Sequence, residues 1–199
     1  MFSKAIVRTP CKAMVRGLRS ADLGLPNYQK ALIQHQDYIM ALQECGLGVT
    51  VLPADESFPD STFVEDPALI TPRCTVLTRP GASSRTAEAI ALRGALSALF
   101  DNIETIEPPG SVEAGDIMMV EDFYYIGLSE RTNPSGAEQM IDILRKYGMD
   151  GVTVTLSKVL HLKTGLSYLE DNNLLVCGEF VNHDTFRQFN QIEVPSDES

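Results

Sequence analysis

Three residues suited to acid–base chemistry recur at a constant spacing in this sequence. Glu65, Glu113 and His161 follow one another at 48-residue intervals, and each opens an apolar stretch after a strand-like segment and a turn. Carboxylates beside a histidine can hold a cation and can transfer protons. If the spacing marks a structural repeat, equivalent ends of equivalent strands would bring these side chains to one central place. The alternative is a coincidence that involves three exposed turn residues.

The segments that must position these residues also repeat in order. Apolar residues at helical spacing predict a helix in "NYQKALIQHQDYIMALQECG", with an apolar stripe from Tyr28 to Cys45 and an end at Gly46. Further helices are predicted in "TAEAIALRGALSALF" and "AEQMIDILRKYG", and short strands at 49–53, 102–108 and 152–156. Second strands are predicted in "CTVLTRP", "FYYIGLSERTN" and "NNLLVCGEF". The alternation predicts an α/β fold of ββαβ-like units.

The stretch "FPDSTFVEDPALI" places Asp60 and Asp66 near Glu65, so that three acids surround a short apolar strand. Buried carboxylates cost desolvation free energy unless a cationic, hydrogen-bonding group lies between them. A guanidinium matches, because its planar fork donates hydrogen bonds in pairs to carboxylates. Arg85 and Arg131 follow second strands and could hold a carboxylate at the far end of the same ligand. The pattern favours an arginine-like amino acid, with a solvated acidic turn as the alternative.

Composition limits the class of protein. The chain has 199 residues, of which 44% are hydrophobic, and this predicts one globular domain over residues 1–199. The formal charge of −11 argues against a nucleic-acid partner. No stretch resembles a signal peptide or approaches the roughly 18 apolar residues of a membrane span, so we expect a cytoplasmic protein that is a monomer or homodimer and has no membrane partner. The widely spaced Cys11, Cys45, Cys74 and Cys177 are expected to be free thiols.

The quoted motifs resemble those of one enzyme family. "LPADESFPDSTFVEDPALI", "TRPGASSR", "VEAGDIMMV", "GLSERTN" and "VLHLKTGLSYLEDNNLL" look like the dimethylarginine dimethylaminohydrolases, members of the guanidino-group-modifying superfamily. The match runs in order from "IVRTP" to the last residues. It implies a five-bladed α/β propeller of ββαβ units around a central polar site, here without its last blade. It also implies hydrolysis of asymmetric dimethylarginine or monomethylarginine to citrulline plus the methylated amine.

The resemblance gives catalytic roles to two residues. His161 in "LHLK" would be the catalytic histidine, a general acid toward the leaving amine and a general base toward water. Glu113 in "VEAGD" would orient that histidine and help to hold the guanidinium.

Substrate-binding roles follow from the same motifs. Asp66 would grip the guanidinium nitrogens, and Asp60, Phe63 and Glu65 would complete that wall of the site. Arg85 and Arg131 resemble contacts to the amino-acid end of the substrate. Leu18 in "RGLRS" matches a lid-loop position that contacts substrate through its backbone. The implied partner is therefore a small cationic amino acid, a methylated arginine.

The chain departs from the family pattern at the nucleophile. The family uses a cysteine near the C-terminus of a longer chain, and its thiolate attacks the guanidinium carbon to form a covalent thiouronium. None of the four cysteines here matches that motif. We therefore expect the nucleophile beyond residue 199 and expect the 199-residue chain alone to be inactive, with a naturally short, non-catalytic paralogue as the alternative. A thiolate, a histidine and water suffice for this chemistry, so no metal or organic cofactor is expected.

Two other functions stay open at this stage. One is an arginine deiminase-like enzyme that acts on arginine or on another guanidine. The other is a non-catalytic module that binds arginine-like ligands. Citrulline release from dimethylarginine against arginine would separate the first from the leading prediction, and binding without turnover would indicate the second.

Overall fold

The computed structural model describes residues 2–19 and 24–195. The chain divides into two compact units, Met1–Val64 and Glu65–Ser199. Helices and strands alternate in both units, so the predicted α/β class is confirmed. Among the described residues, no helix is both long enough and apolar enough to cross a bilayer.

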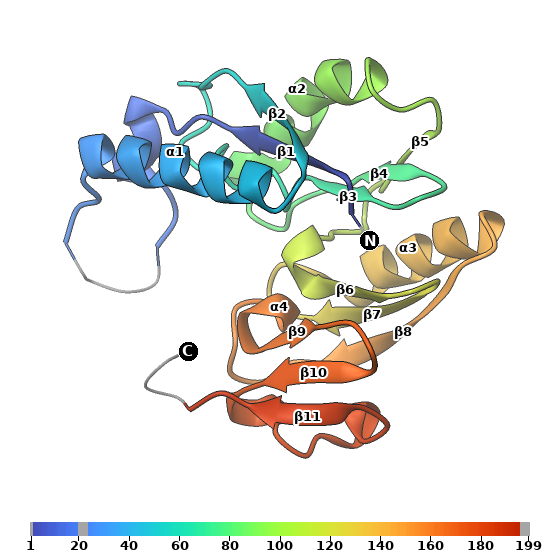
Figure 1. Cartoon of the computed structure of the whole chain (residues 1–199). Helices are drawn as coiled ribbons and strands as arrows, with labels where there is room; N and C mark the ends of the chain where they lie inside the picture. Colours follow the sequence, from blue (N-terminus) through green and yellow to red (C-terminus); the bar gives the residue numbers. More distant parts are fainter. Residues whose placement is uncertain (1, 20–23, 196–199) are drawn as a thin grey trace. The chain divides into compact units, whose positions relative to one another are not determined.

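The first unit contains a parallel strand pair joined by a helix. Strands β1 (Lys4–Arg8) and β2 (Gly48–Leu52) pair in parallel, and α1 (Tyr28–Glu44) lies beside them in Figure 1. The Asn27 side chain accepts a hydrogen bond from the Lys30 backbone N–H and so caps the start of α1. Gly46, with φ of 84°, follows its end in the left-handed conformation, as predicted.

The apolar stripe of α1 is largely exposed. Ile39 is its only buried residue, whereas the Tyr38 side chain is 55% exposed and Cys45 is exposed. The helical period was correct, but within its own unit α1 packs mainly on β2 and on the 3-10 turn Lys12–Arg16. A two-stranded sheet is too narrow to cover an apolar stripe of this width.

The second unit repeats one sheet topology. Each sheet has an antiparallel strand pair and a third strand parallel to the second, which confirms the predicted repeat. The strands are β3 (Ala68–Ile70), β4 (Thr75–Leu77) and β5 (Ile103–Thr105), then β6 (Ile117–Val120), β7 (Phe123–Leu128) and β8 (Asp150–Thr155), and finally β9 (Leu166–Tyr168), β10 (Asn173–Val176) and β11 (Asn190–Glu193). β5 ends earlier than predicted, ahead of Pro108 and Pro109, which have no backbone N–H to donate.

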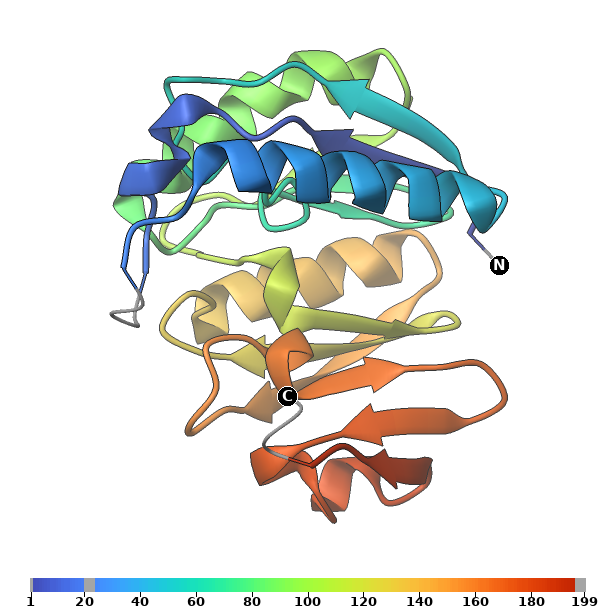
Figure 2. The ribbon, with the colours of Figure 1, turned by 60° about the vertical axis from the view of Figure 1, so that its left-hand side comes forward.

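The connections between second and third strands differ among the repeats. Helix α2 (Thr86–Ser97) joins β4 to β5, and α3 (Pro134–Lys146) joins β7 to β8. Between β10 and β11 the chain instead forms two 3-10 turns, Gly178–Phe180 and Asp184–Phe186, so the third repeat departs from the ββαβ pattern. A short helix, α4 (Leu162–Gly165), precedes β9 (Figure 2).

Two apolar clusters fix the middle sheet from its two faces. On one face, Ala137, Met140 and Leu144 of α3 pack fully buried against a cluster that includes Tyr124 and Ile126 of β7. On the other face, Tyr125 belongs to a second cluster with Phe180, Phe186 and Phe189. Alternate residues of β7 therefore serve different clusters, as strand geometry requires. This double packing holds β6, and the acidic motif "VEAGD" lies directly before that strand.

The cysteines agree with the sequence prediction. Cys11, Cys45, Cys74 and Cys177 are all free thiols. Cys11 and Cys74 are buried, so both pack as small apolar side chains.

Candidate active site

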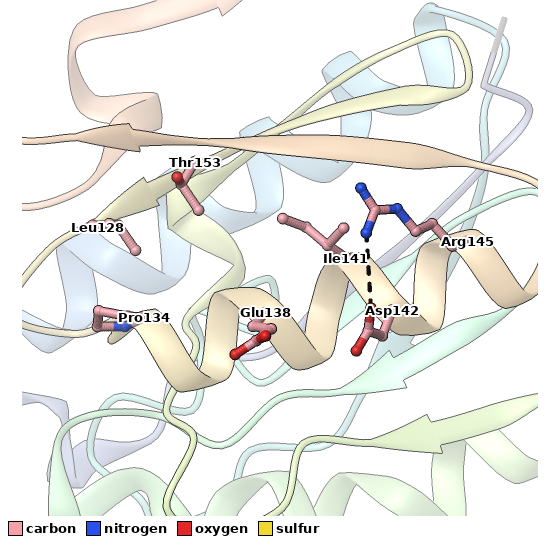
Figure 3. A pocket seen from close by; sticks show the side chains of 7 residues that line it. All are labelled: Leu128, Pro134, Glu138, Ile141, Asp142, Arg145 and Thr153. Atoms are coloured by element: carbon pink, nitrogen blue, oxygen red, sulfur yellow. Dashed lines mark ion pairs between the residues drawn. The ribbon is translucent and has the colours of Figure 1, made fainter.

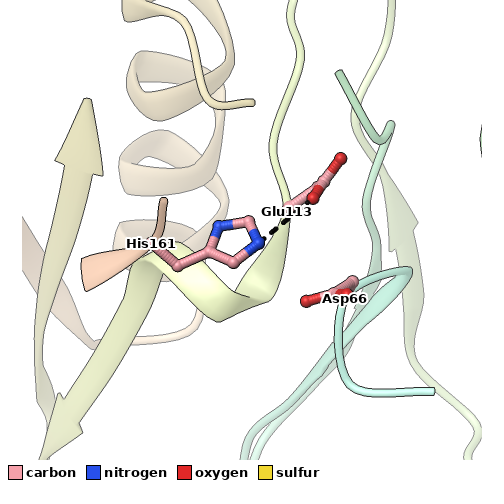
Figure 4. Close-up of side chains that lie close together, drawn as sticks. All are labelled: Asp66, Glu113 and His161. Atoms are coloured by element: carbon pink, nitrogen blue, oxygen red, sulfur yellow. Dashed lines mark ion pairs between the residues drawn. The ribbon is translucent and has the colours of Figure 1, made fainter. Parts of the chain in front are cut away.

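Three of the predicted site residues converge within the second unit. Asp66 precedes β3, Glu113 precedes β6 and His161 precedes α4, and their side chains point toward one another in Figure 4. One ligand-type atom from each residue lies within 4.8 Å of the others. Nε2 of His161 is 3.4 Å from Oε2 of Glu113. We call this group the Asp66–Glu113–His161 cluster.

The repeat spacing missed one of the two carboxylates of the cluster, Asp66, which only the family resemblance indicated. The 48-residue spacing pointed to Glu65, but the Glu65 side chain is 64% exposed and pairs with Lys163. The backbone explains the difference, because the Asp66 carbonyl accepts hydrogen bonds from Ala114 N–H at 3.0 Å and from Thr78 Oγ1 at 2.7 Å. These bonds hold the Asp66 main chain beside the "VEAGD" segment.

Arg85 lies against the cluster. It is 5% exposed, and its guanidinium bonds Glu88 through Nε and Nη2, each at 2.9 Å, and Asp66 through Nη1 at 2.5 Å. Burial works against its charge, but Glu88 and Asp66 outweigh burial and raise the pKa of Arg85. Arg85 thus holds one oxygen of Asp66 in place, a contact that the sequence analysis did not foresee.

Arg131 also faces a carboxylate of the cluster, at longer range. Its Nη1 is 4.0 Å from Oε1 of Glu113, and its side chain is 23% exposed. Both predicted arginines therefore contact the acidic cluster in this structure, although a separate basic end of the site was expected. Their binding of a ligand carboxylate stays a prediction.

The charges of the cluster shift the pKa values of its members. Burial disfavours the charged imidazolium, but the neighbouring Asp116, Asp66 and Glu113 outweigh burial and raise the pKa of His161. Burial and the charge of Asp66 raise the pKa of Glu113, against the smaller opposing effects of Ala82 N–H, His161 and Arg131. Proton exchange between His161 and a bound group is therefore electrostatically feasible near neutral pH.

Sequence reasoning missed two residues of this region, Asp116 and Glu88. Asp116 is fully buried, and its Oδ1 is 3.3 Å from Nδ1 of His161. A signal was present, since "VEAGD" places a second acid three residues after Glu113. Gly115 between them lies so close to the cluster that a Cβ there would be 2.9 Å from Oδ1 of Asp66 and 3.1 Å from the His161 ring. The glycine leaves the room that these side chains occupy.

The remaining predicted binding residues belong to the first unit. The Leu18 backbone N–H donates to Oδ1 of Asp60 at 2.9 Å, and Asp60 is buried. The Phe63 N–H donates to the Asp60 carbonyl at 3.0 Å, and the Phe63 side chain is 57% exposed. Their contact with a ligand stays a prediction.

Two carboxylates and an imidazole are ligands that a divalent metal could accept. However, one oxygen of Asp66 already pairs with the guanidinium of Arg85, which is a planar organic cation. A flat organic cation needs carboxylates but no free imidazole nitrogen. The cluster therefore fits an organic cation better than a metal ion.

A separate shallow groove runs along α3 and β8 (Figure 3). Its lining residues are Leu128, Pro134, Glu138, Ile141, Asp142, Arg145 and Thr153. None of them belongs to the Asp66–Glu113–His161 cluster, so the groove is not part of the candidate site.

Comparison with known proteins relates this arrangement to one family. A model described as "N,N dimethylarginine dimethylhydrolase, eukaryotic" matches residues 19–197. The N(G),N(G)-dimethylarginine dimethylaminohydrolase of Pseudomonas aeruginosa is 56% identical over 200 residues, which span all of this chain and 79% of the relative.

Solved structures agree with the sequence comparison. The Pseudomonas aeruginosa enzyme, as a cysteine-to-serine variant complexed with citrulline, superimposes with a TM-score of 0.98 at 56% identity, over 100% of this chain and 78% of that chain. A dimethylarginine dimethylaminohydrolase with histidine replaced by glycine, in an adduct with S-methyl-L-thiocitrulline, gives the same TM-score, identity and coverage. The chain therefore belongs to the N,N-dimethylarginine dimethylhydrolase family.

Proposed function

We propose that this chain binds a methylated arginine and supplies the acid–base residue that hydrolyses it to citrulline. The Asp66–Glu113–His161 cluster carries the proposal, since it brings two carboxylates and one imidazole within 4.8 Å of one another, and carboxylates pair well with a guanidinium. Asymmetric dimethylarginine and monomethylarginine are the proposed substrates. Dimethylamine or methylamine is the second product.

In the proposed reaction, Asp66 and Glu113 hold the guanidinium nitrogens. A cysteine thiolate attacks the guanidinium carbon, so that a C–S bond forms, and His161 gives a proton to the methylated nitrogen as its C–N bond breaks. His161 then takes a proton from water, whose oxygen adds to the same carbon. The C–S bond then breaks as the added hydroxyl becomes the C=O group and gives its remaining proton to the released amine, and citrulline and the thiolate are released.

The nucleophilic cysteine is proposed to follow residue 199 in the active enzyme. Support comes from the Pseudomonas aeruginosa structure, a cysteine-to-serine variant complexed with citrulline, of which this chain covers 78%. Among the cysteines here, Cys11 and Cys74 are buried, and burial raises the pKa of the Cys74 thiol, which lowers its reactivity.

The remaining contacts are proposed from the family resemblance. Arg131 is better placed than Arg85 to bind the ligand carboxylate, because Arg85 already bonds Asp66 and Glu88. Leu18, Asp60, Phe63 and Glu65 are proposed to complete the binding wall. We also propose that the three repeated sheets belong to a five-bladed propeller, which their shared strand topology supports.

The test measures citrulline release from asymmetric dimethylarginine, monomethylarginine and arginine. It uses the 199-residue chain and, separately, the chain joined to the C-terminal segment of the Pseudomonas aeruginosa relative. We expect binding by calorimetry in both and turnover only in the joined protein. A preference for arginine would replace the proposal with a deiminase-like function, and binding without turnover in both proteins would indicate a binding module.

A further inference from the structure

Asp116 is a fully buried carboxylate that lies on the opposite side of the His161 ring from Glu113. It ends the 3-10 turn Ala114–Asp116, which leads into β6, and it is 0% exposed. Nδ1 of His161 is 3.3 Å from Oδ1 of Asp116, whereas Nε2 is 3.4 Å from Oε2 of Glu113. The imidazole therefore has one carboxylate at each nitrogen.

We propose that Asp116 is a positioning residue that keeps a proton on Nδ1 of His161 and thereby makes Nε2 the nitrogen that exchanges protons with the ligand. The assignment of Nε2 to proton exchange rests on the proposed function. The assignment of the proton to Nδ1 of His161 in the ligand-free chain does not rest on that function.

The two carboxylate oxygens of Asp116 accept different hydrogen bonds. Oδ2 accepts hydrogen bonds from Ser129 Oγ at 2.7 Å and from Thr132 Oγ1 at 2.6 Å. Oδ1 accepts one from the Leu162 backbone N–H at 3.1 Å. Because a carboxylate oxygen has two lone pairs, Oδ1 keeps one that can accept from Nδ1 of His161.

The surroundings of Nδ1 favour a proton there. The atom is buried and has no aligned hydrogen-bond partner among the described residues, and its ion-pair contact is with Oδ1 of Asp116. An unprotonated Nδ1 would direct its lone pair at a carboxylate oxygen, which is repulsive. Nε2 also faces a carboxylate, Glu113 at 3.4 Å, but that carboxylate has only long contacts and its pKa is raised by burial and by Asp66. Asp116 accepts three hydrogen bonds that fix its oxygens as acceptors, so the neutral ring keeps its proton on Nδ1.

The same carboxylate holds the turn that carries Arg131. Ser129 Oγ, which donates to Asp116, also accepts from the backbone N–H groups of Arg131 at 2.9 Å and Thr132 at 3.1 Å. Thr132 Oγ1 in turn accepts from the Glu113 backbone N–H at 3.1 Å. Asp116 thus joins the segments that carry Glu113, Arg131 and His161.

Nearby charged groups set the background for any titration of His161. Asp116 and Glu113 face the ring from the segment before β6, and Asp66 faces it from the turn before β3. Arg85 and Arg131 contact Asp66 and Glu113, respectively. A test must therefore separate the effect of Asp116 from a general change in charge.

Imidazole ¹⁵N NMR of the free chain provides the test. Its three histidines are His35, His161 and His183, so two signals serve as internal references. In the wild type we expect neutral His161 to carry its proton on Nδ1. In Asp116→Asn we expect the His161 pKa to fall by about one pH unit and the preference for Nδ1–H to weaken.

Two control variants sharpen the result. Asp122→Asn removes the same charge from an exposed acid that pairs with Arg73, and it should leave the His161 signals unchanged. Thr132→Val removes a hydrogen bond from Oδ2 and the acceptor of the Glu113 N–H but keeps the Asp116 charge, so the proton of neutral His161 should stay on Nδ1.

A proton on Nε2 of neutral wild-type His161 would overturn the proposal, even if Asp116→Asn failed to fold. An unchanged His161 pKa in a folded Asp116→Asn variant would also overturn it. These measurements need no ligand, so a failure to hydrolyse dimethylarginine would refute the proposed function while leaving this inference intact.

Discussion

The two sides of the His161 ring differ in how completely the fold satisfies their carboxylates. On the inner side, Asp116 accepts three hydrogen bonds of 2.6–3.1 Å. On the outer side, the contacts of the Glu113 carboxylate with Ala82 N–H, His161 and Arg131 are 3.4, 3.4 and 4.0 Å long. Both carboxylates are buried, so they differ in their hydrogen-bond and ion-pair partners and not in their exposure. In the free chain, the fold itself supplies close hydrogen-bond donors to Asp116. Glu113 has only long contacts, so its carboxylate can still bind a cation.

This difference predicts that the two carboxylates have different roles, one in stability and one in ligand binding. Removing a carboxylate whose partners are all in the fold leaves buried donors unpaired, and the cost appears as lost stability. Removing a carboxylate with weak partners relieves desolvation, and the cost appears as lost ligand binding. Asp116 should therefore matter for folding and Glu113 for binding.

The largest effect is expected at the residue between the two sides. His161→Ala should lower turnover by about 10²- to 10⁴-fold in a catalytically competent protein that contains this chain, because the general acid–base group is lost. Ligand binding should be largely retained. Steady-state kinetics with dimethylarginine would measure this, with His35→Gln as the control, and unchanged turnover would refute the assigned role.

Substitutions at the two carboxylates test the comparison directly. Asp116→Ala should lower the free energy of unfolding by about 3–5 kcal/mol, because Ser129, Thr132 and Leu162 each lose an acceptor. Glu113→Gln should change it by less than about 1 kcal/mol, because the amide keeps the shape and removes a desolvated charge. Urea unfolding would measure both values. Equal losses in the free energy of unfolding for the two variants would contradict the different roles of Asp116 and Glu113.

Gly115 tests the space between the two sides. Gly115→Ala should cost about 1–3 kcal/mol and should weaken ligand binding, because the added Cβ would crowd Asp66 and His161. Gly94→Ala in α2 is a matched control, since a Cβ there meets nothing within 4 Å, and it should stabilise the chain by about 0.5–1 kcal/mol. A neutral Gly115→Ala would show that the cluster has more room than the structure indicates.

The pH dependence of stability should reflect the raised pKa of His161. The folded state binds this proton more tightly than the unfolded state, whose histidine pKa is about 6.5. The contribution of protonated His161 to the free energy of unfolding is therefore fully present below about pH 6.5, and it is lost as the pH rises through the pKa of His161 in the folded state. Thermal unfolding from pH 5.5 to 9 would show the decline, and His161→Gln should flatten it. The same decline in that variant would assign it to another group.

The smallest effect is expected at the exposed pair of Glu65 and Lys163. Surface ion pairs contribute little, so Glu65→Gln should change the free energy of unfolding by less than about 1 kcal/mol. Unfolding in low and high salt would measure it. A larger loss of stability would mean that the fold depends on the Glu65 carboxylate as it does on that of Asp116.

The sequence predicted the repeat and all three residues of the cluster, Glu113 and His161 through the spacing and Asp66 through the family resemblance. Spacing alone identified Glu113 and His161, because equivalent positions in equivalent units share a place in the fold. It selected Glu65 in place of Asp66, because which of two adjacent side chains turns inward depends on backbone hydrogen bonds to Ala114 and Thr78. Helical periodicity predicted both α1 and α3, but only α3 has a sheet in its own unit that covers its apolar stripe.

By itself, the sequence determined the α/β class, the 48-residue repeat, the family resemblance and the acidic character of the site, because these follow from residue order and type. Only the tertiary structure decided how the charges pair. It joined Arg85 to Asp66 and Glu88, and it placed Asp116 behind His161. The physical reason is that these pairs join residues whose distance and alignment depend on how the strands and turns that carry them pack together.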